Sequence, residues 1–576
     1  MPVTTGKRPS AGAPAPAALI APAGGRYNRG MTFTATRPAT SSSSEDAGPG
    51  FLSPAPEVRI TNAFVRAFDN VVATARTCYS GSGIVRDEQV LGDAQAPPEK
   101  KEERRRRRDS LARDLYQAGH HTTLQHAHFQ FALDNVSRQF LWSFLHSHPF
   151  YNSEQVSQRY VTVKPGHYAV PPLQRQALEV YEETVARQQR AYDDLCRLLL
   201  GPASSAYYGR YPARRHYGAK YDKEVQKKAQ EVARYVLPVA TFAYLYHTVS
   251  GLTLLRYHRI CREPDTPLEQ RLVVGRMVEE LLAREPAYAA ILEGPIPEEE
   301  TAEWEALRAS GPRRDVQRLE FLREFDRDLG GRVSVLADYP AKNEETLARA
   351  VREVLGLTRD RLTDDDAIAA VMDPARNRYL GEALNLTSLS KLSRAMVHCH
   401  YTFRKKMSHT ADSQNQRHRM TPASRPILHT QLTPEPDYIT PLLVREDEAC
   451  LARYREVMES SWEGFSRLRA LGVQDEFAAY VLPNALALRF TESANLLDLH
   501  HKLAMRLCYN AQEEIWRASV DEAQQIGSVN PRIGRYLLPP CSLRQMAKAR
   551  PICPEGKRYC GERVWTYRLD DYRRVI

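Results

Sequence analysis

A short pattern occurs twice in this chain, as Ala233-Arg234-Tyr235-Val236-Leu237-Pro238 and as Ala478-Ala479-Tyr480-Val481-Leu482-Pro483. Each Leu-Pro pair precedes an apolar stretch of similar length, which we expect to be a helix. Upstream, Thr122-Thr123-Leu124-Gln125 has a weak counterpart in Thr387-Ser388-Leu389-Ser390. The repetition predicts two diverged copies of one domain within a single chain.

Length and composition agree with a chain of several packed units. The 576 residues are 42% apolar and 26% charged, enough to bury more than one core. No apolar run approaches the length of a membrane span, and no apolar stretch follows a basic start, so we expect neither a membrane segment nor a secretory signal. Nine scattered cysteines do not indicate a disulfide scaffold, and a cytoplasmic location is expected.

The formal net charge is +10, which alone does not give a function. Part of it is the run Arg104–Arg108, which we interpret as a solvated loop or helix end in preference to a phosphate-binding patch. The sequence has no aromatic RNA-binding motif and no zinc-finger spacing, so a nucleic-acid partner is not predicted.

The pattern of apolar residues predicts a helix-rich α+β fold. Phe129–Leu133 alternates like a strand, and helices are expected at 136–145, 174–200, 223–260 (in two pieces), 386–407, 446–471, 474–490 and 494–526. The predicted divisions are a disordered tail at 1–55, a first domain at 56–265, a helical connector at 266–375, a second domain at 376–535, and a Pro- and Cys-containing tail at 536–576.

Four polar clusters could carry chemistry. The loop 119–126 could hold a ligand, with a helix cap or a histidine metal site as alternatives. The loops 147–160 and 413–420 offer hydroxyls, amides and guanidinium groups that suit a phosphate, although solvated loops would look similar. In the helix 495–515, Arg506 lies among apolar residues and needs a protein or ligand partner unless it extends to solvent.

Together these clusters resemble the flavin-dependent thymidylate synthases. The family signature is Arg-His-Arg, seven residues, then Ser, with Arg and Tyr following. Arg417-His418-Arg419 is an intact triplet, and Ser147-His148-Pro149 is followed after seven residues by Ser157, Arg159 and Tyr160. The segments 73–80 and 119–126, and the run from Val481 to Arg506, also resemble the family. The likeness covers roughly 58–262 and 376–530.

The resemblance implies two copies packed face to face as a pseudo-dimer, each with a twisted antiparallel sheet flanked by helices. It also implies two chains per assembly, because family members are homotetramers with sites between subunits. The implied substrate-binding residues are Gln414, Arg417, Ser157, Gln158, Arg159, Arg234 and Arg506, with Arg506 also catalytic. The implied FAD-binding residues are His120, Thr122, Gln125, Arg417, His418, Arg419 and Asn495.

The two copies have lost complementary parts of this pattern. The first copy keeps Ser157, Arg159 and Arg234. It has Ser147 where the second copy keeps Arg417, and Cys261 where the second copy keeps Arg506. The second has Ile427, His429 and Ala479 where the first keeps Ser157, Arg159 and Arg234. We therefore predict one nucleotide site per chain, split between the copies, with its mirror-image site abandoned. Loss of both sites is the alternative.

The implied reaction is C5 methylation of dUMP, with the carbon from methylenetetrahydrofolate and the hydride from FAD reduced by NADPH. Gln125, Leu497 and His501 depart from the family's cofactor-binding residues. C5 hydroxymethylation or another alkylation of a pyrimidine nucleotide, and a catalytically silent nucleotide-binding scaffold, remain alternatives.

Three cysteines of the C-terminal tail, Cys541, Cys553 and Cys560, could ligate zinc or iron. Their spacings match no common metal site, and the sequence shows no fourth ligand. We therefore expect structural thiols and predict no metal ligand.

Overall fold

The computed structural model describes residues 50–92, 95–146, 150–264, 267–311 and 314–574. Most of the expected N-terminal tail, the positions Ser147-His148-Pro149 and the last two residues lie outside them. The compact unit from Pro49 onward contains both predicted copies. Helices dominate and two small sheets are present, which confirms the helix-rich α+β class.

Each sheet has four strands, and both sheets have the same strand order. The first is β1-β2-β4-β3 and the second is β5-β6-β8-β7, with all neighbours antiparallel. The strands are β1 (Glu57–Ala63), β2 (His128–Ser137), β3 (Asn152–Gln155), β4 (Phe242–Ser250), β5 (Ser334–Asp338), β6 (His400–Ser408), β7 (Ala423–Ser424) and β8 (Ala487–Asn495). One topology used twice supports the predicted repeat.

The helices also correspond between the halves. In the first half they are α1 (Ala67–Thr77), α2 (Asp87–Leu91), α3 (Pro98–Gln117), α4 (Arg138–His146), α5 (Arg175–Leu198), α6 (Leu200–Arg210), α7 (Gly218–Ala233), α8 (Gly251–Arg259) and α9 (Leu268–Arg284). The rest are α10 (Ala302–Ser310), α11 (Asp315–Leu329), α12 (Asn343–Leu355), α13 (Asp364–Met372), α14 (His409–Asn415), α15 (Leu442–Arg445), α16 (Glu448–Ala470), α17 (Asp475–Ala478), α18 (Leu496–Arg506), α19 (Glu513–Val529), α20 (Pro531–Gly534) and α21 (Pro540–Met546). In chain order α4, α5, α8 and α9 correspond to α14, α16, α18 and α19.

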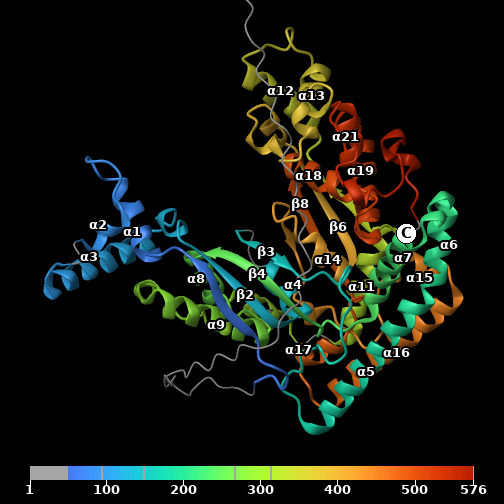
Figure 1. The fold of residues 1–576 in the computed structure, drawn as a ribbon, viewed down its shortest axis with the longest axis horizontal. Helices are drawn as coiled ribbons and strands as arrows, with labels where there is room; N and C mark the ends of the chain where they lie inside the picture. The colour runs from blue at the N-terminus through green and yellow to red at the C-terminus, as the bar shows by residue number, and fades with distance from the viewer. Residues whose placement is uncertain (1–49, 93–94, 147–149, 265–266, 312–313, 575–576) are drawn as a thin grey trace, which may run out of the picture. The chain divides into compact units, whose positions relative to one another are not determined.

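A shared core joins the halves. The long helices α5 and α16 lie side by side (Figure 1). Their buried faces, including Tyr181, Tyr192 and Tyr454, belong to one hydrophobic cluster with contributions from both halves. Two further clusters lie within the individual halves, one around the first sheet and one around the second.

The two copies of the Leu-Pro pattern pair with each other. Pro238 forms an isolated antiparallel bridge with Pro483. Val239 N donates to Leu482 O at 2.9 Å, and the equivalent Asn484 N donates to Leu237 O at 2.8 Å. The hydrogen bonds are therefore reciprocal, as expected where equivalent segments face each other.

The apolar stretches after these Leu-Pro pairs are strands, not the helices we expected. β4 occupies 242–250 and β8 occupies 487–495, while β6 replaces the end of the helix expected at 386–407. Their residues alternate between the two faces of a sheet, for example with Phe403 and Met407 buried in β6. A short apolar run does not distinguish strand from helix, and cross-strand pairing decided it here.

The arginine run is also placed differently. It lies within α3 (Pro98–Gln117), and Arg108 is buried, with ion pairs to Asp69 at 2.9 Å and Asp109 at 2.8 Å. Arg105 and Arg107 are exposed and form ion pairs with Glu102 and Glu103. The run is therefore part of a helix in which Arg105, Arg106 and Arg107 are exposed, whereas Arg104 is half-buried and its Nη1 donates to the carbonyl of Leu91 at 3.0 Å.

The segment 266–375, expected to be a connector, belongs to the first half at its N-terminal end and to the second half at its C-terminal end. α9 packs Val273, Met277 and Leu281 into the core of the first half. β5 is the edge strand of the second sheet, and α12 and α13 bury Leu347 and Ile368 beneath it. The many charged residues of this segment hide the apolar faces of its helices from a sequence-based prediction.

The tail after 535 has little regular structure beyond α21, but it buries Val564 and Tyr572 against Trp516.

Candidate functional site

The loop after β3 brings predicted residues of the first half against the second half. Arg159 Nη2 donates to Glu231 Oε2 at 3.1 Å and to the carbonyl of Asn510 at 3.0 Å. Gln158 is buried, and Asn484 Nδ2 donates to its Oε1 at 3.2 Å. The Ser157 hydroxyl accepts from the Arg159 amide at 3.3 Å. The loop is thus fixed by partners from both halves.

Arg234 lies next to this loop. Its side chain is buried and its Nε donates to the carbonyl of Glu231 at 3.2 Å. Burial lowers the pKa of Arg234, and the neighbouring Arg159 adds to that effect. Although burial alone would raise the pKa of Glu231, Arg159 and Lys228 hold it at about 2. One carboxylate therefore faces several cations, which leaves positive charge in excess.

The second half contributes Arg506 at the end of α18. Its Nε donates to His418 Nε2 at 2.7 Å, and its Nη2 donates to the carbonyl of Gln414 at 3.0 Å. Burial, together with the charges of Arg417 and Arg159, lowers the pKa of Arg506 to about 10. Arg506 therefore remains protonated at neutral pH and lies within electrostatic range of residues from both halves.

Four buried side-chain donors at this place have no hydrogen-bond partner among the described residues. They are Gln158 Nε2, Arg159 Nε, Arg234 Nη2 and Gln414 Nε2. Buried polar groups are normally paired, because an unmade hydrogen bond costs about 1–3 kcal/mol. A cluster of unpaired donors, half of them cationic, suits an anionic ligand with several acceptor oxygens.

Arg417 and Arg419 line a separate groove. Arg417 Nη2 pairs with Glu154 Oε2 at 2.6 Å, and Arg419 Nη2 donates to Asn152 Oδ1 at 3.2 Å. The groove has a volume of about 410 Å³ and is also lined by Gln130 and Tyr246 of the first sheet. His418 is held behind it by Arg506, and burial keeps the pKa of His418 well below its usual value, so the imidazole is neutral.

The other expected FAD-binding residues are not at this groove. His120, Thr122 and Gln125 are exposed at the turn before β2, which packs against α1 and α8 of the first half. None of the three lines the groove. Asn495 caps α18, with its Oδ1 accepting from the Asp498 amide at 3.0 Å. Leu497, one of the departures, is buried in the core of the second half.

The mirror-image positions are occupied differently. Cys261 and Ala479 are buried, and Ser147 lies outside the described residues. Ile427 borders a cavity whose other lining residues include Ala302 and Leu307 of α10. A helix from the charged middle segment, α10, therefore lies next to one of the mirror positions.

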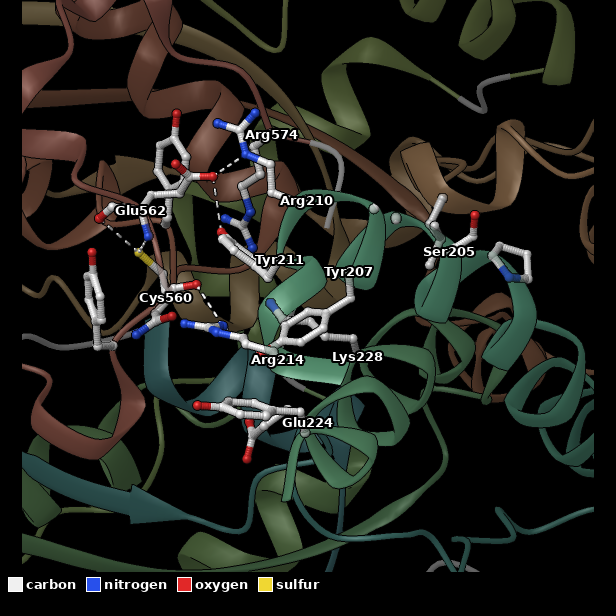
Figure 2. Close-up of a pocket in the computed structure, with 18 of the residues that line it drawn as sticks. Ser205, Tyr207, Arg210, Tyr211, Arg214, Glu224, Lys228, Cys560, Glu562 and Arg574 are labelled. Atoms are coloured by element: carbon white, nitrogen blue, oxygen red, sulfur yellow. Dashed lines mark hydrogen bonds and ion pairs between the residues drawn. The ribbon is translucent and has the colours of Figure 1, made fainter. Parts of the chain in front are cut away.

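A cavity that was not predicted lies beside the ion pair of Arg159 and Glu231. It has a volume of about 890 Å³ and lies between α6–α7 and the C-terminal tail (Figure 2). Eight lysine or arginine side chains line it against four carboxylates. Arg214 stacks over Tyr211, 4.3 Å from the ring centroid, and Lys228 and Arg574 extend toward Glu231. These residues are far apart in the sequence and follow no motif, so only the fold could bring them together.

Arg138 is a second residue that sequence reasoning missed. It is buried at the start of α4, and its Nη2 donates to the carbonyl of Val156 at 2.8 Å while Nη1 donates to Gln155 Oε1 at 3.3 Å. Burial and the nearby Arg234 lower its pKa to about 9. Arg138 therefore supports the loop that carries Ser157.

No helix of the described residues is long and apolar enough to cross a membrane.

The sequence model of one protein family, the thymidylate synthase complementing proteins, matches the chain twice, over residues 60–287 and 335–532.

Relatives from other organisms show the same similarity. A flavin-dependent thymidylate synthase of Clostridium tetani is 29% identical over 196 residues, which are 33% of this chain and 69% of that protein. One from Sulfurisphaera tokodaii is 30% identical over 155 residues, 26% of this chain and 59% of that protein. The solved structure of the UMP/dUMP methylase PolB from Streptomyces cacaoi, bound with 5-Br dUMP, has 19% identity and a TM-score of 0.28 over 41% of this chain and 96% of that one. The expected resemblance is confirmed, and because the two matches span most of its length, the chain belongs to the family of thymidylate synthase complementing proteins.

Proposed function

We propose that the chain is a flavin-dependent enzyme of the thymidylate synthase type. It transfers a one-carbon unit from methylenetetrahydrofolate to C5 of dUMP, with reduction through FAD by NADPH. The observation that carries the proposal is the set of buried, unpaired donors: three from the first half (Gln158, Arg159, Arg234) and Gln414 from the second. They suit the phosphate and uracil oxygens of a pyrimidine nucleotide.

In the proposed site the two halves bind different parts of the nucleotide. Ser157, Gln158, Arg159 and Arg234 hold the phosphate side, where positive charge exceeds negative. Arg506 faces the uracil from the other half with its Nη1, because Nε and Nη2 are occupied by His418 and Gln414. A protonated guanidinium there stabilises negative charge that develops on the uracil ring and so activates C5.

The groove residues fit part of the cofactor. Two arginines at one groove, Arg417 and Arg419, suit the diphosphate of FAD. The chemistry that FAD supplies when bound is hydride transfer. Because His120, Thr122 and Gln125 lie on another part of the first half, we propose that they reach FAD bound at the groove of a second chain.

This assembly requires two chains, each of which is a pseudo-dimer of domains. The reciprocal hydrogen bonds around Pro238 and Pro483 support the pseudo-dimer. We place the first domain from Glu57 to about residue 287 and the second from about residue 334 to 535, in agreement with the sheets and the family matches.

The test of the reaction is the mass of the product formed from labelled dUMP. Purified chain with FAD, NADPH and methylenetetrahydrofolate should yield a nucleotide heavier by one methylene unit. A product heavier by one CH2O unit, the net gain of hydroxymethylation, would favour the alternative alkylation. Nucleotide binding without any product would favour the scaffold.

A further inference from the structure

Four cysteines from two separate segments line one small cavity beside the candidate site. Cys508 follows α18, and Cys541, Cys553 and Cys560 belong to the C-terminal tail. The cavity has a volume of about 10 Å³, roughly the space of one water-sized sphere. It can therefore receive a single ion but no organic ligand.

Backbone amides approach the sulfurs in a repeated way. The amide of Glu562 donates to Cys560 Sγ at 3.5 Å, two residues along the chain. The amides of Asn510 and Glu555 make the same bond to Cys508 and Cys553, also two residues along. Gly561 follows Cys560 with φ of +102°, which lets the chain turn around the sulfur. Such donors stabilise a thiolate, so three of the four cysteines are prepared for negative charge.

All four thiols border this one cavity. A divalent cation bound among them would favour every thiolate at once.

We propose that Cys508, Cys541, Cys553 and Cys560 bind one zinc ion as four thiolates. Four-sulfur tetrahedral coordination is a usual arrangement for structural zinc. Each thiol gives up its proton on binding, so four protons are released and the complex carries two negative charges. Arg214, whose Nη1 donates to the carbonyl of Cys560 at 3.3 Å, lies close enough to offset part of that charge (Figure 2).

The ion would draw the sulfurs inward. In the described part of the chain, no three histidine, cysteine or acidic side chains already form a metal-binding group. A cysteine sulfur moves by rotation about χ1 alone, and all four sulfur-bearing residues already border the same cavity. Sequence spacing could not show the site, because the fourth ligand, Cys508, belongs to the second domain and not to the tail.

The zinc would join the tail to the second domain next to Arg159. Cys508 is two residues before Asn510, whose carbonyl accepts from Arg159 and whose Nδ2 donates to the carbonyl of Arg558 at 2.6 Å. This consequence rests on the proposed function, whereas zinc binding itself does not.

Metal analysis of the purified, reduced full-length chain tests the proposal. We expect one zinc per chain, lost in Cys553→Ser and Cys560→Ser and retained in the matched control Cys196→Ser, whose half-buried thiol lies on α5. The metal-free wild-type chain titrated with Co²⁺ should show thiolate-to-cobalt charge-transfer absorption with one equivalent, which does not depend on how well the variants fold.

Three results would overturn the proposal. They are a reduced wild-type chain that holds no zinc and gives no cobalt band, iron with a visible chromophore in place of zinc, and zinc that persists in both tail variants. Arg506→Ala separates this proposal from the proposed function, because it should weaken dUMP binding while zinc stays bound.

Discussion

The hydroxyl of Tyr235 donates to Glu514 Oε2 at 2.7 Å across the boundary between the halves, and Tyr480 makes the same bond to Glu269 at 2.8 Å. Each glutamate also accepts from a serine of its own half, Ser408 for Glu514 and Ser137 for Glu269. All four residues of the tyrosine–glutamate pairs are buried. Equivalent residues thus make equivalent bonds in opposite directions, which ties the two halves together twice.

Removing either hydroxyl should destabilise the fold. Tyr235→Phe and Tyr480→Phe each lose a hydrogen bond to a carboxyl group, and we expect each to cost about 1.5–3 kcal/mol in the free energy of unfolding. Tyr288→Phe is the control, because that buried hydroxyl has no hydrogen-bond partner among the described residues. Chemical denaturation measures all three. Equal stability of the two variants and the control would show that the halves do not depend on these bonds.

The same glutamates should make stability depend on pH. Burial raises the pKa of Glu514 to about 7 and that of Glu269 to about 6, above the roughly 4.3 of an unfolded glutamate. The folded state therefore binds more protons than the unfolded state between these values. Stability from each carboxyl is complete below the unfolded pKa and is lost as pH rises through the folded pKa, by at most about 1.4 kcal/mol per pH unit.

Denaturation between about pH 5 and 8 tests this slope. Glu514→Gln and Glu269→Gln keep an acceptor for the tyrosine but cannot ionise, so each should flatten the decline. Glu231, with a folded pKa of about 2, has the opposite sign and loses its contribution only at lower pH. A slope unchanged in both glutamine variants would be inconsistent with this assignment.

Flavin retention should depend on the groove. We expect Arg417→Ala and Arg419→Ala each to weaken FAD binding about ten- to a hundredfold, the loss of one charge-assisted hydrogen bond to a phosphate. Titration with FAD, followed by flavin fluorescence, gives the affinity. Arg445→Ala on α15, outside the groove, is the control. If both groove variants bind FAD like the wild type, the cofactor is held elsewhere.

Two chains should assemble. Light scattering of the purified chain should give the mass of a dimer, and His120→Ala should weaken FAD binding without changing that mass. A strict monomer that nevertheless binds FAD tightly would contradict the placement of His120, Thr122 and Gln125 at a second chain's groove.

The repeat could be predicted, because it rests on a short local pattern that the two family matches confirm. The division of the nucleotide site between the halves stays a prediction. Arg506 could be predicted to need a partner, because it is a charged residue among apolar neighbours in the sequence, and it does contact Gln414 and His418. β4 and β8 were mistaken for helices, because their identity depends on partner strands distant in the sequence. Two other features could not be predicted. Arg159 is held by Glu231 and Asn510, and Cys508 lies beside the tail cysteines. Both bring together segments that share no motif, so only the folded chain shows them.

The central claim is that one nucleotide site is split between the halves, and titration with dUMP tests it most directly. Ser157→Ala and Arg159→Ala in the first half and Gln414→Ala and Arg506→Ala in the second should each weaken binding roughly ten- to a hundredfold, with stability checked in parallel. The mirror variants Ser147→Ala, Cys261→Ser, Ile427→Val and Ala479→Ser should bind like the wild type. Normal binding by Ser157→Ala and Arg506→Ala, together with failure of the mirror variants, would contradict the account.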